Sequence, residues 1–116
     1  MPVQQGIFPP RLLGLFSGRE VVLTIAGGII TKIPYNSNYV LNGQGDLADD
    51  LDTINGGIDG DIVILKRGDD IITVKHGTGN ITLPGGADVV LAANNDMLTL
   101  QWCADDDEWY CLSSET

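Results

Sequence analysis

The residues that could do chemistry in this chain are one histidine, two cysteines and sixteen carboxylates. His76 is the only candidate base for a Ser/His/Asp or Cys/His site, and it stands beside Gly77, where a strand is expected to end. No nucleophile motif such as G-x-S-x-G accompanies it. Most of the carboxylates fall in Gly- and Asn-rich stretches, where solvated carboxylates do no acid–base work. We therefore expect a turn histidine and a protein that is not an enzyme.

Calcium is the metal that the sequence brings into question. Six aspartates on one expected loop are hard oxygen ligands: Asp46, Asp49, Asp50, Asp52, Asp59 and Asp61. The EF-hand spacing fails, because counting from Asp50 places Ile54 where an oxygen ligand belongs and Asn55 where the invariant glycine belongs. The glycine runs at 77–80 and 85–88 do not match a phosphate-binding loop either. A solvated acidic loop is preferred over a calcium site, and we expect no cofactor.

The two cysteines fall on the arms of an expected final hairpin. Cys103 and Cys111 flank the acidic run 105–108, whose mutual repulsion places it in a solvated turn. A disulfide forms only if the register brings the two residues opposite each other. No secretory signal is visible, so we expect synthesis in a cytoplasm and prefer two free thiols, with a disulfide as the alternative.

The charge distribution excludes some partners. The 116 residues carry 16 acidic and 6 basic side chains, a net charge of −10, which repels phosphate backbones and disfavours nucleic acid as a partner. No apolar run approaches the roughly 20 residues of a membrane helix, so no membrane partner is expected. Through residue 45 three basic groups against Glu20 give +2, whereas the remainder, with 3 basic and 15 acidic groups, carries −12. One end is suited to docking while the other faces solvent.

The first nineteen residues read as an extended arm. The arm holds six large apolar side chains, and Pro9-Pro10 excludes a helix or a central strand there. So apolar a segment must lie against its own domain, a sister subunit or another protein. The alternative interpretation is that this segment is the first strand and turn of the core. We predict two parts, an arm at 1–19 and a single β domain at 20–116.

The remainder predicts an all-β fold, a small antiparallel sandwich or barrel. Residues 21–25 and 29–33 flank Ala26-Gly27-Gly28 and predict a hairpin, residues 35–41 predict another strand, and 42–60 predict a loop with one helical turn. Polar residues then precede apolar runs at steps of 8 to 10 residues, starting at Asp61, Asp70, Asn80, Asp88 and Asp96. Short strands at that spacing are typical of compact all-β domains, and long helices are excluded.

Several stretches of the second half resemble a module widespread in virion proteins of tailed bacteriophages. They are DDLDTINGG at 49–57, GDIVILK at 60–66, TVKHGTGNITL at 73–83 and DMLTL at 96–100, followed by Trp109. The similarity covers more than half of the chain, and VKHGTGNI with the Trp-containing terminal strand is its most specific part. Two departures from the module's pattern are the added Trp102 with its acidic turn, in place of Y-[DN]-G-x-x-W, and the lack of a fibre shaft upstream.

The resemblance implies a β-rich, often trimeric structural or recognition part. A short chain with one trimerising head and an apolar arm is similar to capsid decoration, or cement, proteins, which stabilise the head lattice. The expected partners are therefore further copies of the chain and the major capsid protein, at the virion surface. A tail-fibre tip or receptor-binding protein is the alternative. We predict that the arm docks through Ile7, Phe8, Arg11, Leu13, Phe16 and Arg19, and that Trp109 is the more buried of the two tryptophans.

Overall fold

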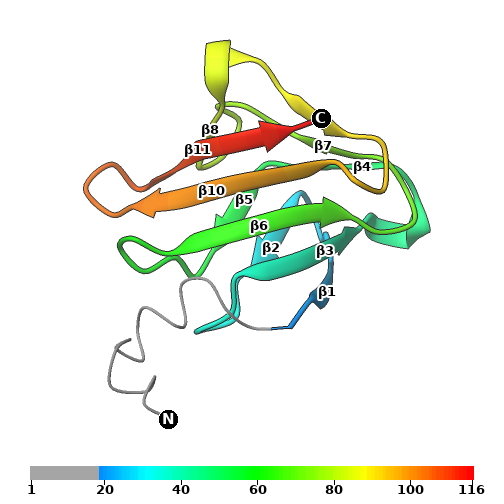
Figure 1. Cartoon of the computed structure of the whole chain (residues 1–116), viewed down its shortest axis with the longest axis horizontal. Coiled ribbons are helices and arrows are strands. Elements are labelled where there is room, and N and C mark those ends of the chain that lie inside the picture. Colours follow the sequence, from blue (N-terminus) through cyan, green and yellow to red (C-terminus); the bar gives the residue numbers. More distant parts are fainter. Residues whose placement is uncertain (1–18) are drawn as a thin grey trace, which may run out of the picture.

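The computed structural model describes residues 19–116, and within them it is almost entirely β-structure (Figure 1). The predicted all-β class is confirmed. In chain order the elements are β1 (Val21–Thr24), β2 (Ile29–Thr31), β3 (Asn38–Asn42), the 3₁₀ turn η1 (Gln44–Asp46), β4 (Asp49–Leu51), β5 (Thr53–Asn55), β6 (Ile62–Arg67), β7 (Ile72–Val74), β8 (Ile81–Thr82), the 3₁₀ turn η2 (Pro84–Gly86), β9 (Val89–Leu91), β10 (Met97–Cys103) and β11 (Glu108–Glu115).

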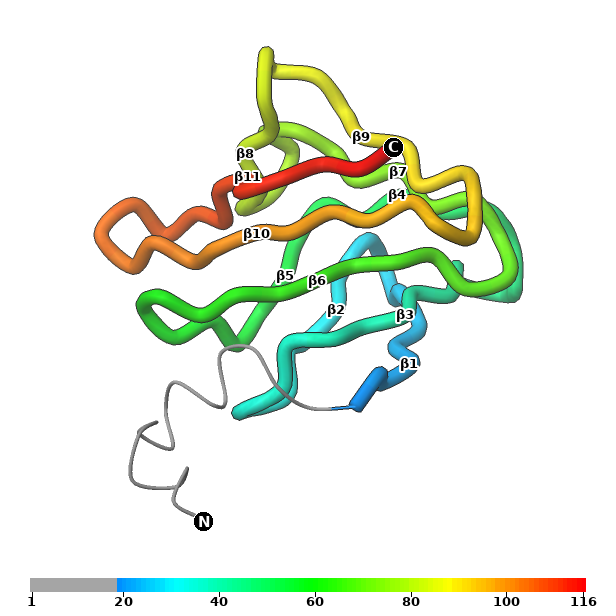
Figure 2. The backbone as a smooth tube through the Cα atoms, in the orientation of Figure 1, coloured from blue at the N-terminus to red at the C-terminus, as the bar shows by residue number. Residues whose placement is uncertain are grey.

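The strands form three sheets that enclose one core. The largest has the order β1-β3-β6-β10-β11-β8, and the smaller ones are β2-β5 and β4-β7-β9. Figures 1 and 2 show β3, β6, β10 and β11 side by side in one layer, with the two smaller sheets behind them. All three sheets contribute side chains that are at most 4% exposed, among them Tyr39, Leu41, Leu65, Leu98, Leu100 and Trp109 from the large sheet, Ile30 and Ile54 from the second, and Leu51, Ile72, Val74 and Leu91 from the third.

The pairing within the sheets corrects the predicted antiparallel arrangement. β10 pairs antiparallel with both β6 and β11, and β7 does so with β9. The other five pairs, β1–β3, β3–β6, β2–β5, β4–β7 and β8–β11, are parallel. Parallel neighbours need a long connection between them. Here the chain makes these long connections by passing through the other sheets before it returns to the sheet that it left.

The expected hairpin at 21–33 is also wrong, although its turn exists. Ala26 and Ile29 exchange two backbone hydrogen bonds of 3.1 Å, and Gly27 and Gly28 adopt φ of 60° and 80°. The turn is a corner, however, because β1 pairs with β3 and β2 pairs with β5. The Gly28 carbonyl accepts hydrogen bonds from the N–H groups of Asp52 and Thr53, at 2.8 and 3.1 Å. These bonds attach the corner to the start of β5.

Two strands, β4 and β5, lie inside the segment predicted to be a loop. Asp49 and Asp50 disfavour a strand by composition, yet β4 pairs with β7 and buries Leu51 completely. The helical turn expected there is η1. From residue 61 onward the predicted strands are confirmed, since strands begin at Ile62, Ile72, Ile81, Val89 and Met97. The predicted final hairpin is also present, because β10 and β11 pair antiparallel.

Candidate functional site

Of the six predicted docking residues, the structure describes one, Arg19. Ile7, Phe8, Arg11, Leu13 and Phe16 lie outside the described residues, so their predicted role stays a prediction. Arg19 is the first described residue and is exposed, two positions before β1 begins.

The VKHGTGNI segment forms a loop that is held by its own side chains. Asp88 accepts a 2.8 Å hydrogen bond from the His76 backbone N–H and pairs with the Lys75 ammonium at 2.9 Å. These two contacts, the His76 N–H first, lower the pKa of the Asp88 carboxyl, so this carboxylate stabilises the fold at neutral pH. That contribution is lost as the pH falls through the lowered pKa.

The His76 ring closes the same loop. Its Nδ1 accepts a 2.9 Å hydrogen bond from the Leu83 backbone N–H, seven residues later. An imidazole nitrogen that accepts must be unprotonated, which puts the proton of the neutral ring on Nε2. The sequence predicts that His76 lies at a turn. In the structure its hydrogen bond with Leu83, the residue before η2, fixes the path of the chain into η2.

We expect His76→Ala to destabilise the protein by about 1 to 2 kcal/mol, because it removes the acceptor and leaves the N–H of the buried Leu83 without a partner. His76→Asn is the matched control, since an amide oxygen can take the place of Nδ1 and should restore most of the loss. Urea unfolding at one fixed protein concentration measures both variants. Equal losses for Ala and Asn would show that the Nδ1 bond contributes nothing.

Asn80, in the same segment, bonds to two strands, β5 and β11. Its side chain donates to the Ile54 carbonyl at 2.8 Å and accepts from the Ile54 N–H at 3.0 Å, as a neighbouring strand would. Its own carbonyl accepts from the Trp109 N–H at 2.8 Å. Gly79 lies so close to the start of β5 that an added Cβ would clash with the Thr53 hydroxyl and with the carbonyl oxygen of the preceding Asp52. These two motif residues therefore connect β5 to β11.

The two tryptophans pack together at the same place. Trp109 is fully buried, as predicted, whereas Trp102 is only partly buried and lies directly opposite it on β10. Their ring centroids are 5.3 Å apart at an interplanar angle of 54°, and Trp109 Nε1 donates to the Ile54 carbonyl at 3.1 Å. A Cβ on Gly57 would lie 2.7 Å from the Trp102 ring and 3.0 Å from that of Trp109, so only glycine fits against the pair.

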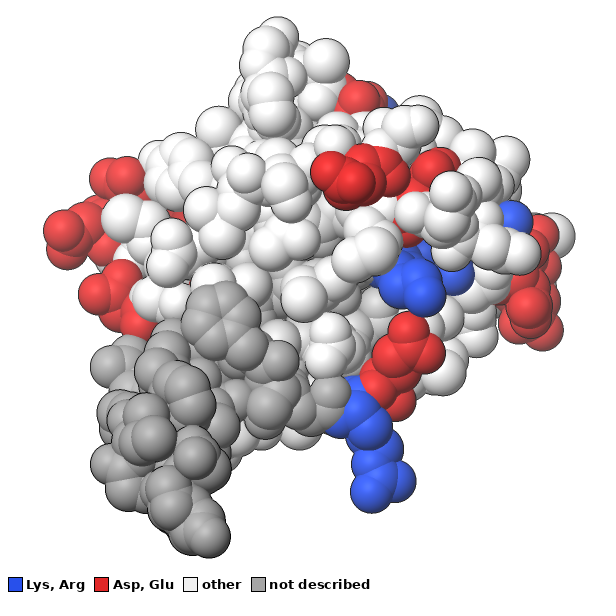
Figure 3. All heavy atoms as spheres, viewed as in Figure 1, with Lys and Arg blue, Asp and Glu red and all other residues white. Residues whose placement is uncertain are grey.

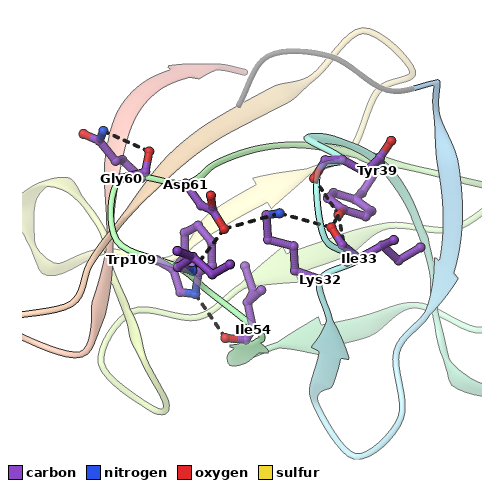
Figure 4. Close-up of polar contacts among 10 residues, drawn as sticks. Lys32, Ile33, Tyr39, Ile54, Gly60, Asp61 and Trp109 are labelled. Atoms are coloured by element: carbon purple, nitrogen blue, oxygen red, sulfur yellow. Dashed lines mark hydrogen bonds and ion pairs between the residues drawn. The ribbon is translucent and has the colours of Figure 1, made fainter. Parts of the chain in front are cut away.

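Lys32 and Asp61 form a buried ion pair that the sequence did not predict. Lys32 was expected to be one of the basic groups at a docking end. The Lys32 side chain is 3% exposed, and its ammonium lies 3.4 Å from an Asp61 carboxylate oxygen and donates to the Ile33 carbonyl at 3.1 Å (Figure 4). The Tyr39 hydroxyl donates to the Asn36 carbonyl at 2.7 Å and accepts from the Ile33 N–H at 3.0 Å. Burial raises the pKa of this hydroxyl. A lysine at the end of β2 and an aspartate at the start of β6 give no local signal that they meet.

The carboxylates of the acidic loop bind backbone N–H groups, mostly of the loop itself and in one case of the turn between β10 and β11. Asp49 accepts from the N–H groups of Gln44 and Asp50, at 2.9 and 2.8 Å. Asp61 accepts from the Ile58 N–H at 3.0 Å, and Asp59 accepts from the Ala104 N–H at 3.1 Å. Within residues 19–116, no group of three or more His, Cys, Asp or Glu side chains is arranged to hold a metal ion.

Both cysteines are free thiols, which the sequence favoured over a disulfide. The register places Cys103 opposite Glu108 and Cys111 opposite Leu100, so the two residues are not cross-strand partners. Burial raises the pKa of the Cys111 thiol, which lowers its thiolate fraction and its reactivity at neutral pH.

The strands of the large sheet carry few charges, although Figure 3 shows charged side chains on this face as well as around it. Its six strands contain four charged residues, Lys66, Arg67, Glu108 and Glu115, and the last three stand at the ends of their strands. Lys66 pairs with Glu20 at 3.4 Å. The sheet face is thus nearly free of uncompensated charge in a strongly acidic chain.

Comparison with protein-family models and with curated proteins yields no match to the chain. Within the described residues, no helix is long and apolar enough to cross a membrane. The fold and geometry described above define an all-β domain whose polar side chains largely hold its own loops.

Proposed function

We propose that this chain is a bacteriophage structural protein that decorates and stabilises the capsid as a homotrimer bound to the assembled head lattice. The proposal rests on the resemblance of residues 49–109 to phage virion modules and on what those residues do in the fold. It assigns the protein no catalytic role and no cofactor.

The observation that carries the proposal is the use of the VKHGTGNI segment. Lys75, His76 and Asn80 are its residues with long polar side chains, and each forms an ion pair or hydrogen bond within the chain. A motif that served catalysis or ligand binding would direct some of these groups toward a substrate. A motif that is used to close loops and join strands belongs to a structural module.

The proposed contact with the capsid is the arm, residues 1–19. Burying Ile7, Phe8, Leu13 and Phe16 in a groove of the lattice would contribute roughly 1.5 to 3 kcal/mol for each side chain before ordering costs. Arg11 and Arg19 would add charge-assisted hydrogen bonds to coat carboxylates. The acidic remainder would face solvent and keep particles apart.

Stabilisation of the head follows from mass action. A protein that binds the assembled lattice and not its dissociated subunits stabilises the lattice by RT ln(1 + [L]/Kd). A trimer presents three arms at once, so modest individual contacts combine through their effective concentration.

We expect a truncation that lacks residues 2–16 to keep the trimer and to lose binding to expanded heads in a pelleting assay. Phe8→Ser/Phe16→Ser is the matched variant, since it keeps the arm's length and removes two of its apolar side chains. Normal pelleting of the truncation would eliminate the arm as the anchor. Loss of the trimer by the truncation would place the arm in the subunit interface instead. Binding of the intact protein to host cells rather than to heads would favour the receptor-binding alternative.

A further inference from the structure

The outer face of the large sheet has a composition that is unusual for a solvent-exposed surface. Strand alternation directs Tyr39, Leu41, Leu65 and Leu98 into the core, so the residues between them point outward. The cross-strand rows on the outer side include Val22 beside Val40, and Ile64 beside Thr99 beside Ser113. A sheet with one solvated face ordinarily alternates apolar inward with polar outward. Here most outward positions are apolar or uncharged, and the charged exceptions are Lys66, beside Val40, and Glu108 and Glu115 at the ends of β11.

Exposed apolar side chains lie on two strands of this sheet, β1 and β11. Val22 on β1 is 59% exposed, Leu112 on β11 is 53% exposed and Tyr110 on β11 is 37% exposed. Figure 1 looks onto the outer side of the sheet, and among the described residues no strand crosses it. On the strands between β1 and β11, the outward apolar residues Val40 and Ile64 are half-buried. Exposed apolar side chains on one face mark an interaction site.

The charge distribution points to the occupant. The acidic loops lie at the two ends of the strands, with 43–48 and 68–71 at one end and 104–107 at the other. A cationic partner would be drawn to those ends. A second copy, which also carries −10, is repelled from them and can approach closely only where carboxylates are absent. The large sheet comes nearest to such a face, because its two carboxylates, Glu108 and Glu115, stand at the ends of β11 and Glu20 beside it is paired with Lys66.

We infer that copies of this chain meet through the outer face of the sheet β1-β3-β6-β10-β11, with Ile64 and Thr99 at the centre of the contact. In a trimer, a sheet face that points at the three-fold axis meets both neighbours at once. The inference rests on the self-association in the proposed function, and it does not depend on capsid binding.

Thr99→Arg tests the contact, with Thr73→Arg as its matched control. Both threonines are half-buried on central strands, Thr99 in the large sheet and Thr73 between Asp50 and Val90 in the three-stranded sheet. Arginine adds bulk and a charge that must be desolvated in an interface, without adding to the acidic repulsion. Light scattering over a concentration series should show a trimer for the wild type and for Thr73→Arg. The dissociation constant of Thr99→Arg should rise about 30-fold or more, the effect of disrupting an interface hot spot.

Val22→Arg is the second test variant, because a 59% exposed position on an edge strand tolerates the change even where Thr99→Arg impairs folding. Circular dichroism confirms that each variant is folded. Wild-type mass for folded Thr99→Arg and Val22→Arg would overturn the inference, as would equal dissociation of Thr73→Arg. A wild-type monomer would overturn it together with the trimer. Failure to pellet with heads, by contrast, would refute the capsid role and leave the interface standing.

Discussion

Replacing Trp109 with alanine is expected to lower the free energy of unfolding by about 3 to 5 kcal/mol, the range for removing a well-packed large aromatic side chain. Trp109 is 0% exposed, so its whole ring would be replaced by a cavity. The substitution also removes the 3.1 Å bond to the Ile54 carbonyl and the contact with Trp102. Because whole domains are stable by only about 5 to 15 kcal/mol, we expect little soluble, assembled protein.

Trp102→Ala is the natural comparison, since it removes the same kind of ring from the other side of the pair. Trp102 is partly exposed, so its loss should cost clearly less. Trp109→Phe keeps an aromatic ring in the core and removes the Nε1 donor. The Ile54 carbonyl still accepts a hydrogen bond from the Asn80 side chain, so this variant leaves no buried acceptor unpaired. Chemical denaturation of the soluble variants, and the yield of soluble protein for the others, measures the order. A larger effect of Trp102→Ala would contradict the assignment of the core.

The contrast between the end of the chain and its beginning shows how much of the fold the sequence could predict. The final hairpin is local, because apolar alternation on each side of an acidic turn specifies two adjacent antiparallel strands. Residues 21–33 offer an equally good local pattern. Their strands nevertheless pair with Tyr39 and Thr53 and their neighbours, so the turn is a corner of the fold. Periodicity identifies a strand but not its partner.

The candidate site has the same limits. Trp109 was predictable from the motif, whereas the functions of His76 and Asn80 depend on residues that become neighbours only when the sheets assemble. The scarcity of charge on the large sheet can be recognised in the sequence only once it is known that β1, β3, β6, β10 and β11 lie side by side. Such surfaces result from topology rather than from any local motif.

Lys32→Met should cost about 3 kcal/mol, at the lower end of the range for breaking a buried ion pair, because 13% of the Asp61 side chain remains exposed to water. Methionine fills much of the space of the lysine stem and supplies no charge. The Asp61 carboxylate then keeps the Ile58 N–H as its hydrogen-bond donor in a largely dry position. Most of the expected loss is therefore the cost of an unpaired buried charge rather than the worth of the bond.

Two further variants separate the cost of the unpaired charge from the contribution of the ion pair itself. Adding Asp61→Asn to Lys32→Met removes the orphan charge, while the amide oxygen can still accept from the Ile58 N–H, so part of the stability should return. Lys75→Met breaks a shorter contact, 2.9 Å from Asp88, but both of those side chains are about one third exposed, and its effect should be much smaller. Burial, rather than distance, decides which of the two lysines the fold depends on. Equal losses for Lys32→Met and Lys75→Met in urea unfolding would refute that reasoning, because the two pairs differ chiefly in their access to water.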